Sequence, residues 1–151
     1  MLCQIIKGRI SVPYIRMWVH LIWATKNREK LITKDLKAKL LKHIRENAEE
    51  KRIYLDFINC VEEHVHATIS LGSSQSISKA AQLLKGESSN WVNKNKLTPV
   101  YFEWQDEYIA VSVSESKINI VRDYIKNQEE HHRKKSFVEE YEGFIEKYRF
   151  S

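Results

Sequence analysis

The sequence predicts an α+β domain built around a four-stranded antiparallel sheet. Two observations lead to this prediction. Segments with strand-like alternation or β-branched and aromatic enrichment are interleaved with segments whose apolar residues recur at helical spacing. Their order is β-α-β-β-α-β-α, and a βαββαβ core is the ferredoxin-like arrangement, in which two helices cover one face of the sheet.

The first half of the chain supplies a strand, a helix and a strand pair. Residues 14–25 are rich in β-branched and aromatic side chains and contain no breaker, so we expect a long strand. Residues 33–52 have an amphipathic helical pattern that begins at Thr33, a good N-cap. Residues 53–61 and 62–71 are predicted to be two strands, and their short link favours an antiparallel hairpin.

The second half begins with another helix and a strand. Ser76 is expected to cap a helix over residues 76–96. Gly86 lies inside that pattern and weakens the case for one continuous helix, unless it allows the close approach of another group. Residues 108–114 alternate cleanly and are predicted to be the fourth strand.

Two more helices are expected after the fourth strand. Ser114 or Ser116 is predicted to cap a long helix over residues 115–135. Residues 136–150 are predicted to form a final short amphipathic helix. This C-terminal part is the departure from a plain ferredoxin-like domain.

The chain length predicts one domain. At 151 residues the chain can bury a core without disulfides or metals. We expect residues 1–13 to be an N-terminal extension and residues 14–151 to form a single domain. Hydrophobic residues make up 42% and charged residues 30%, which is ordinary for a soluble globular protein. The net charge of +5 is compatible with a polyanionic partner but does not identify one.

The sequence also bears on the cellular compartment. The two cysteines, Cys3 and Cys60, have no spacing typical of a disulfide framework or a zinc site, which favours a reducing cytoplasm. No apolar run approaches the roughly 20 residues that span a bilayer. The N-terminus lacks the long apolar region and cleavage site of a signal peptide. We therefore expect a cytoplasmic protein with no membrane partner.

A pair of histidines lies inside the third predicted strand. His64 and His66 are two residues apart, so their side chains share one face of the strand, and Val65 points to the opposite, buried face. Two neutral imidazoles at this spacing can converge on a divalent cation. We expect the sheet face without helices to be open, so that a metal there is accessible to a large substrate. The alternative is two polar residues on a solvated face.

The last long helix carries a candidate nucleophile. Tyr124 and Gln128 are spaced i and i+4, so a continuous helix places them on one face. His131 and His132 continue near that face and have no role that we can assign. The alternative is a solvated helix with one packed tyrosine.

Five sequence pieces, in the right order, resemble one family. The pieces are "VHLIWATKNR" with His20, "HVH" at residues 64–66, "LLKGESS", "FEWQDEYIAVSVS", and "YIKNQ" beginning at Tyr124. Together they resemble the single-tyrosine HUH transposases of small bacterial insertion sequences, including the REP-associated tyrosine transposases. The resemblance runs from about Val19 to Arg133. Departures are Glu63, where the family more often has aspartate, and residues 114–115, where many members have glycine.

The resemblance implies a metal-dependent transposase and endonuclease that acts on single-stranded DNA. By similarity, His64, His66 and Gln128 bind Mg²⁺ or Mn²⁺. Tyr124 is similar to the family's nucleophile, which attacks a DNA phosphate, becomes joined to the 5′ end and frees a 3′-OH. The family cleaves and rejoins DNA at hairpin-flanked element ends. It works as a homodimer, whose tyrosine helix can dock on the partner's histidine strand to form trans active sites.

Several cations are candidates for contacts with DNA phosphates. They are Lys26, Arg28, Lys85 and Arg133, and a solvated surface is the alternative for each. Trp18 and Trp23 are expected to belong to the core rather than to stack on bases.

Two other functions compete with the transposase. A non-catalytic ferredoxin-like nucleic-acid-binding module needs exposed aromatic residues on its central strands, where this chain has histidines. A related HUH enzyme of replication or plasmid transfer is usually longer and often has two tyrosines or three histidines.

Overall fold

The computed structural model describes residues 14–130, 139, 142–143 and 146. The predicted N-terminal extension over residues 1–13 lies outside the described residues, as do His131, His132 and Arg133. Most of the helix that was predicted over residues 136–150 also lies outside them.

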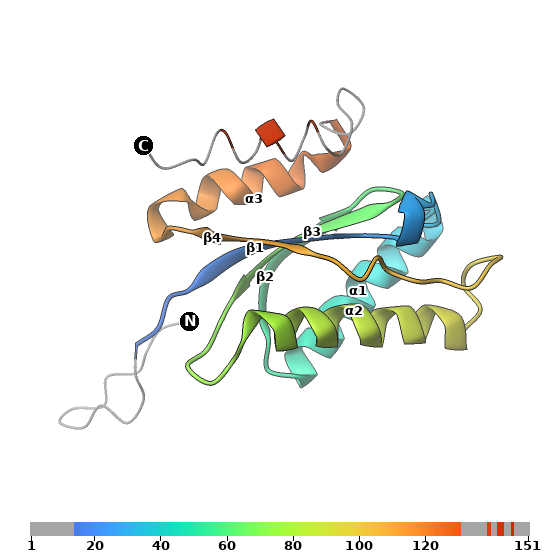
Figure 1. Ribbon diagram of the computed structural model, residues 1–151, viewed down its shortest axis with the longest axis horizontal. Helices are drawn as coiled ribbons and strands as arrows, with labels where there is room; N and C mark the ends of the chain where they lie inside the picture. Colours follow the sequence, from blue (N-terminus) through green and yellow to red (C-terminus); the bar gives the residue numbers. More distant parts are fainter. Residues whose placement is uncertain (1–13, 131–138, 140–141, 144–145, 147–151) are drawn as a thin grey trace.

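The described chain folds around one antiparallel sheet of four strands in the order β2-β3-β1-β4. The strands are β1 (Trp18–Ala24), β2 (Tyr54–Cys60), β3 (His64–Ser70) and β4 (Ile109–Val113). Two long helices, α1 (Lys34–Glu50) and α2 (Ile77–Lys94), lie side by side on one face of the sheet (Figure 1). This arrangement confirms the ferredoxin-like prediction and the antiparallel β2–β3 hairpin.

The main core lies between the sheet and these two helices. Leu21 of β1 and Val65 of β3 point into it and are buried, together with Leu40 of α1 and Leu84 of α2. Each such side chain contributes about 1.5–3 kcal/mol through removal of apolar surface from water. Burial of Val65 on this side fixes its neighbours, His64 and His66, on the opposite side.

The predicted starts of both helices are confirmed. The hydroxyl of Thr33 accepts a hydrogen bond from the Leu36 backbone N–H at 3.2 Å, and Ser76 does the same for Lys79 at 3.2 Å. Helix α2 continues through Gly86, and a Cβ placed there would meet nothing within 4 Å. Close approach of another group is therefore not the reason for this glycine.

The second face of the sheet is covered, which corrects the prediction that it is open. Helix α3 (Ile118–Lys126) lies across it, opposite α1 and α2 (Figure 1). Val121 and Ile125 are buried against Phe57 of β2 and against β4. The physical reason is that the apolar stripe of α3 has to be removed from water, and this face offers the apolar surface that accepts it.

The boundaries of α3 also differ from the prediction. Glu115–Lys117 form a 3₁₀ turn, and neither Ser114 nor Ser116 caps the helix with its side chain. The helix ends at Lys126, and Asn127 forms a turn before the chain becomes helical again at residues 128–130. Tyr124 and Gln128 therefore do not lie on one uninterrupted helix.

Candidate active site

Three histidines gather on the sheet face beneath α3. His64 and His66 project from β3, and His20 from the neighbouring strand β1. All three are buried, with His66 only 1% exposed, which corrects the expectation of an open histidine face. The ring centroids of His64 and His66 are 5.1 Å apart, and those of His20 and His66 are 5.0 Å apart. The described residues thus place the predicted histidine pair in a protected site.

Each strand histidine has a polar neighbour at its Nδ1 atom. Glu63 Oε1 lies 3.2 Å from His64 Nδ1, and His20 Nε2 lies 2.9 Å from His66 Nδ1. Burial lowers the pKa of His20 to about 3, so His20 is neutral near pH 7. Its Nε2 can then accept a hydrogen bond from a protonated Nδ1 of His66. Partners at Nδ1 fix the orientation of an imidazole that binds a metal through Nε2.

Tyr124 joins this group from α3. Its ring centroid is 5.8 Å from that of His66 and 6.4 Å from that of His20. The tyrosine is half-buried, so one side packs on the sheet while the other reaches solvent. One chain therefore brings the predicted nucleophile and the predicted histidines together.

Gln128 is fully buried, although it lies after the Asn127 turn. Among the described residues, neither its Oε1 nor its Nε2 has a hydrogen-bond partner. Asn59, which pairs with His66 across the β2–β3 ladder, donates from Nδ2 to the Ile125 carbonyl at 2.9 Å. This bond attaches the chain just before Gln128 beside the histidines. A buried amide with both groups unsatisfied is costly, so it fits a site that gains a ligand.

The donor set fits a divalent cation of mixed ligation. Within the described ranges, no group of three or more histidine, cysteine, aspartate or glutamate side chains is placed to hold a metal. Two imidazoles therefore need a ligand of another type, and the amide oxygen of Gln128 is a suitable one. A catalytic metal site also needs coordination positions that the protein leaves open and a path by which substrate reaches them.

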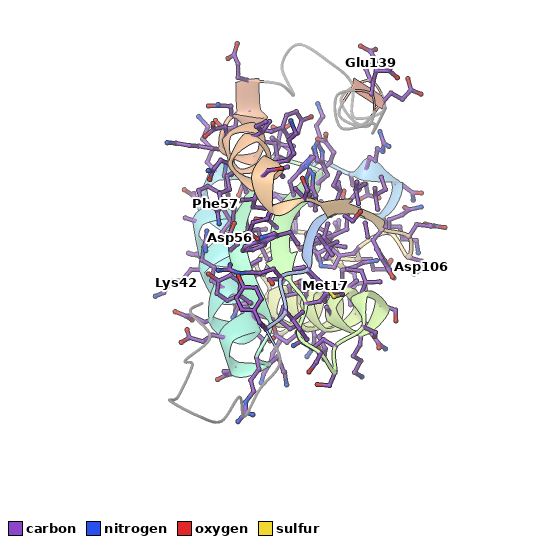
Figure 2. The ribbon with its side chains drawn as sticks, turned by 90° about the vertical axis from the view of Figure 1, so that its left-hand side faces the viewer. Met17, Lys42, Asp56, Phe57, Asp106 and Glu139 are labelled. Carbon is purple, nitrogen blue, oxygen red and sulfur yellow. The ribbon has the colours of Figure 1, made fainter. Side chains whose placement is uncertain are left out.

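A polar clamp, defined here as Asp56 of β2 and Arg122 of α3, holds the helix to the sheet. Arg122 donates from Nε to Asp56 Oδ2 and from Nη2 to Asp56 Oδ1, both at 2.7 Å. A register shift between Leu55 and Phe57 marks an irregularity of β2 at Asp56 (Asp56 and Phe57 are labelled in Figure 2). A bidentate pair of this kind fixes orientation as well as proximity. Nothing in the sequence pattern singled out this pair.

Trp18 and Trp23 are both buried but lie on opposite faces of β1. Trp23 belongs to the main core, as expected. Trp18 instead lies on the α3 side, where its Nε1 donates to Glu115 Oε2 at 2.6 Å and the Arg122 guanidinium carbon is 5.5 Å from its ring centroid. Their odd separation in sequence requires opposite faces in a regular strand.

The candidate DNA-contacting cations have different surroundings. Lys26 is exposed, with its Nζ 3.2 Å from Glu103 Oε2, and Arg28 is exposed in a turn with a φ of 53°. Lys85 donates from Nζ to the Asp106 carbonyl at 2.8 Å, and desolvation lowers its pKa. Lys85 therefore anchors the loop before β4. Arg133 lies outside the described residues.

Comparison with known proteins identifies the family. Residues 13–128 match the family model described as "Transposase IS200 like". The chain belongs to the IS200-like transposase family. This membership makes the protein a transposase and agrees with the covered antiparallel sheet and with the tyrosine on its late helix.

Two solved structures share the fold of this IS200-like transposase. A "putative transposase" from Deinococcus radiodurans R1 is 26% identical with a TM-score of 0.63, covering 82% of this chain and 98% of that one. A REP-associated tyrosine transposase bound to a REP hairpin is 15% identical with a TM-score of 0.59, covering 85% of this chain and 74% of that one. At 15% identity the likeness concerns the fold alone.

Comparison with curated proteins finds no match. In the part of the chain that the structure describes, no helix is both long and apolar enough to cross a membrane.

Proposed function

We propose that this transposase cleaves and rejoins single-stranded DNA at hairpin-flanked element ends, through a covalent 5′-phosphotyrosine formed on Tyr124. The observation that carries the proposal is the position of the Tyr124 ring, 5.8 Å from His66, over a buried histidine pair. A phenol beside two oriented imidazoles suits a reaction at an anionic phosphodiester that is held between them.

The chemistry is a transesterification. The Tyr124 oxygen attacks phosphorus, the bond from phosphorus to the 3′ oxygen breaks, and the phenol proton leaves as the departing 3′ oxygen gains one. Reversal by another 3′-OH joins a new strand and releases the tyrosine. Since one phosphodiester replaces another at each step, no nucleotide triphosphate is needed. The ordinary phenol pKa near 10 means that Tyr124 needs a nearby positive charge to react readily.

We propose that His64, His66 and Gln128 hold Mg²⁺ or Mn²⁺ in this site. A divalent cation supplies charge neutralisation at a non-bridging phosphate oxygen and favours the phenolate. The contribution of the chain is orientation: Glu63 and His20 direct the two imidazoles, and α3 shields the site on one side. Gln128 supplies a neutral oxygen ligand whose buried amide is otherwise unsatisfied among the described residues.

We infer that the substrate is a DNA hairpin and that the protein works as a homodimer. The REP-associated tyrosine transposase of similar fold was solved with a REP hairpin, which supports the first part. The second part comes from the resemblance of the sequence to single-tyrosine HUH transposases, which work as homodimers. The small apolar cluster of Val121 and Ile125 places Tyr124 over the histidines of its own chain, so each protomer would carry a complete site.

The test is a denaturing gel. A labelled hairpin oligonucleotide with single-stranded arms, taken from the DNA that flanks the gene, is incubated with protein and Mg²⁺ or Mn²⁺. We expect a covalent adduct with the unaltered protein and none with Tyr124→Phe. Tyr101→Phe, a matched change of a tyrosine that is 74% exposed, should form the adduct normally. Adduct formation by Tyr124→Phe, or its absence with the unaltered protein, would exclude the proposed chemistry.

A further inference from the structure

A cavity of about 470 Å³ lies at the edge of the sheet, beside β1. The β1–β4 ladder ends at Ile22 and Ile109, and the two segments join again where the Gln105 backbone N–H donates to the Ala24 carbonyl at 2.8 Å and at the Thr25–Trp104 bridge. Between these points residues 106–108 lie outside the strand ladder. Lys85 Nζ donates a hydrogen bond to the Asp106 carbonyl at 2.8 Å and so fixes this segment. The cavity is therefore formed by hydrogen-bonded segments of the fold. Its volume is within the range of small-ligand sites.

The wall of the cavity combines aromatic rings with amides. Trp23 and Tyr108 line it, together with Asn27, Gln105 and Arg28. The Asn27 backbone N–H donates to Gln105 Oε1 at 3.2 Å, which holds the Gln105 side chain in this wall. Aromatic surface for stacking beside amides for edge-on hydrogen bonds is the combination that recognises an unpaired nucleobase.

Trp23 forms the buried side of the cavity. Its side chain is 1% exposed, and its Nε1 has no hydrogen-bond partner in the described part of the chain. The neighbouring indole, Trp104, packs edge-on against it with centroids 5.9 Å apart and donates its Nε1 to Ser88 Oγ at 2.9 Å. The buried Trp23 ring therefore forms the packed wall between the cavity and the main core.

The cavity is next to the candidate active site. Ile22 and Ala24 line it, and they pair directly with His66 and His64 across the β1–β3 ladder. Adjacent strands are about 4.8 Å apart, so the cavity lies one to two strand spacings from the histidine pair. The cavity is therefore within reach of the nucleotide that adjoins a phosphate held at the histidines.

We propose that this cavity binds an unpaired nucleobase of the DNA strand, next to the phosphate that is cleaved. The proposal rests on the proposed function and extends it from chemistry to substrate recognition. The base stacks on Tyr108, its edge meets the Gln105 and Asn27 amides, and Arg28 faces the adjoining backbone.

The experiment measures binding with an abasic residue moved stepwise through both arms of the hairpin oligonucleotide. Fluorescence anisotropy gives the dissociation constant for the unaltered protein, Tyr108→Ala, Tyr108→Phe and Trp23→Phe, with Tyr101→Ala as the control outside the cavity. We expect one arm position at which base removal weakens binding about 5- to 100-fold. In Tyr108→Ala that loss should shrink to about twofold or less, whereas Tyr108→Phe and Tyr101→Ala should keep it. Trp23→Phe should keep it as well, because the indole N–H is buried and does not contact the base.

The outcomes separate this proposal from the chemistry. If no arm position is sensitive, or if Tyr108→Ala retains the full loss, the cavity does not bind a base, even when the Tyr124 adduct forms. If the loss depends on Tyr108 but no adduct forms, the base site stands and the phosphotyrosine chemistry fails. Thermal melting of each variant excludes unfolding as the cause of a change in binding.

Discussion

Glu63 and His20 each lie behind one of the two strand histidines. Their contacts are at Nδ1, where a partner orients an imidazole that binds a metal through Nε2. The Glu63 carboxylate reaches the His64 ring, with Oε1 3.2 Å from Nδ1. Glu63 and His20 therefore determine how well the two imidazoles are oriented toward the proposed metal.

Glu63→Gln should weaken metal binding about 10- to 100-fold, because a neutral amide orients and polarises His64 less well than a carboxylate. Calorimetric titration with Mn²⁺ measures the change. The matched control is Glu62→Gln. Glu62 is exposed, and its Oε2 lies 3.8 Å from Lys30 Nζ in a weak surface ion pair. Equal affinities for the two variants would contradict a role for Glu63 behind His64.

Gln128→Met separates ligation from stability. It replaces a buried amide that lacks partners within the described residues by an apolar group of similar size, so without metal it should stabilise the fold by about 1–3 kcal/mol. With Mn²⁺ at a hundredfold excess over its dissociation constant, the unaltered protein should gain about 2.7 kcal/mol. Gln128→Met should gain much less. Denaturant titrations in EDTA and in Mn²⁺ measure both effects, and an undiminished gain in the variant would rule out Gln128 as a ligand.

Helix α3 is attached to the sheet by a small apolar cluster and by directional polar contacts. Val121 and Ile125 supply the first. The second are the clamp of Asp56 and Arg122, supported by Thr68 Oγ1, which donates to Asp56 Oδ2 at 3.0 Å. Apolar burial is insensitive to direction, whereas the clamp allows one position of the helix. Tyr124 therefore depends on the clamp for its place over His66.

Arg122→Gln should loosen α3 without unfolding the domain. Loss of two charge-assisted hydrogen bonds should lower the free energy of α3 opening by about 1.5–3 kcal/mol, so hydrogen exchange of its amides should accelerate. The main-core amides of α1 should change less. Lys42→Gln, which removes an exposed pair with Glu46, is the control and should shift stability by no more than about 0.5 kcal/mol. Unchanged exchange in α3 would show that the clamp does not hold it.

In the molecule as a whole, two layers serve different purposes. The layer of α1 and α2 buries the main core and stabilises the sheet. The α3 layer, on the opposite face, carries the nucleophile and covers the histidines (Figure 1). Separation of the two allows the chemistry-bearing helix to move while the scaffold stays folded.

The arrangement in one chain gives a prediction about assembly. Tyr124 lies beside the histidines of its own chain, so a mixture of Tyr124→Phe with the His64→Ala and His66→Ala double variant should form no more adduct than either alone. The hairpin adduct gel measures this. Restored adduct in the mixture would show that α3 docks on the partner's histidine strand in the proposed homodimer.

The sequence by itself determined the order of elements, the caps at Thr33 and Ser76, and the common face of His64 and His66. These follow from local periodicity and from side-chain chemistry, which a linear pattern records. The prediction of one continuous helix over residues 115–135 was wrong. Helix α3 ends at the Asn127 turn, where Asn59 of the neighbouring strand β2 donates to the Ile125 carbonyl, and a linear pattern does not record that contact.

Only the tertiary structure decided what surrounds the histidines. The cover of α3, the clamp between residues 66 positions apart, the place of His20 behind His66 and the cavity beside β1 all arise from strand order and register. Such contacts join segments far apart in the chain, and no local pattern specifies which surfaces meet. The physical reason is that apolar burial selects the packing of whole elements, and the polar contacts of the site then form between the side chains that this packing brings together.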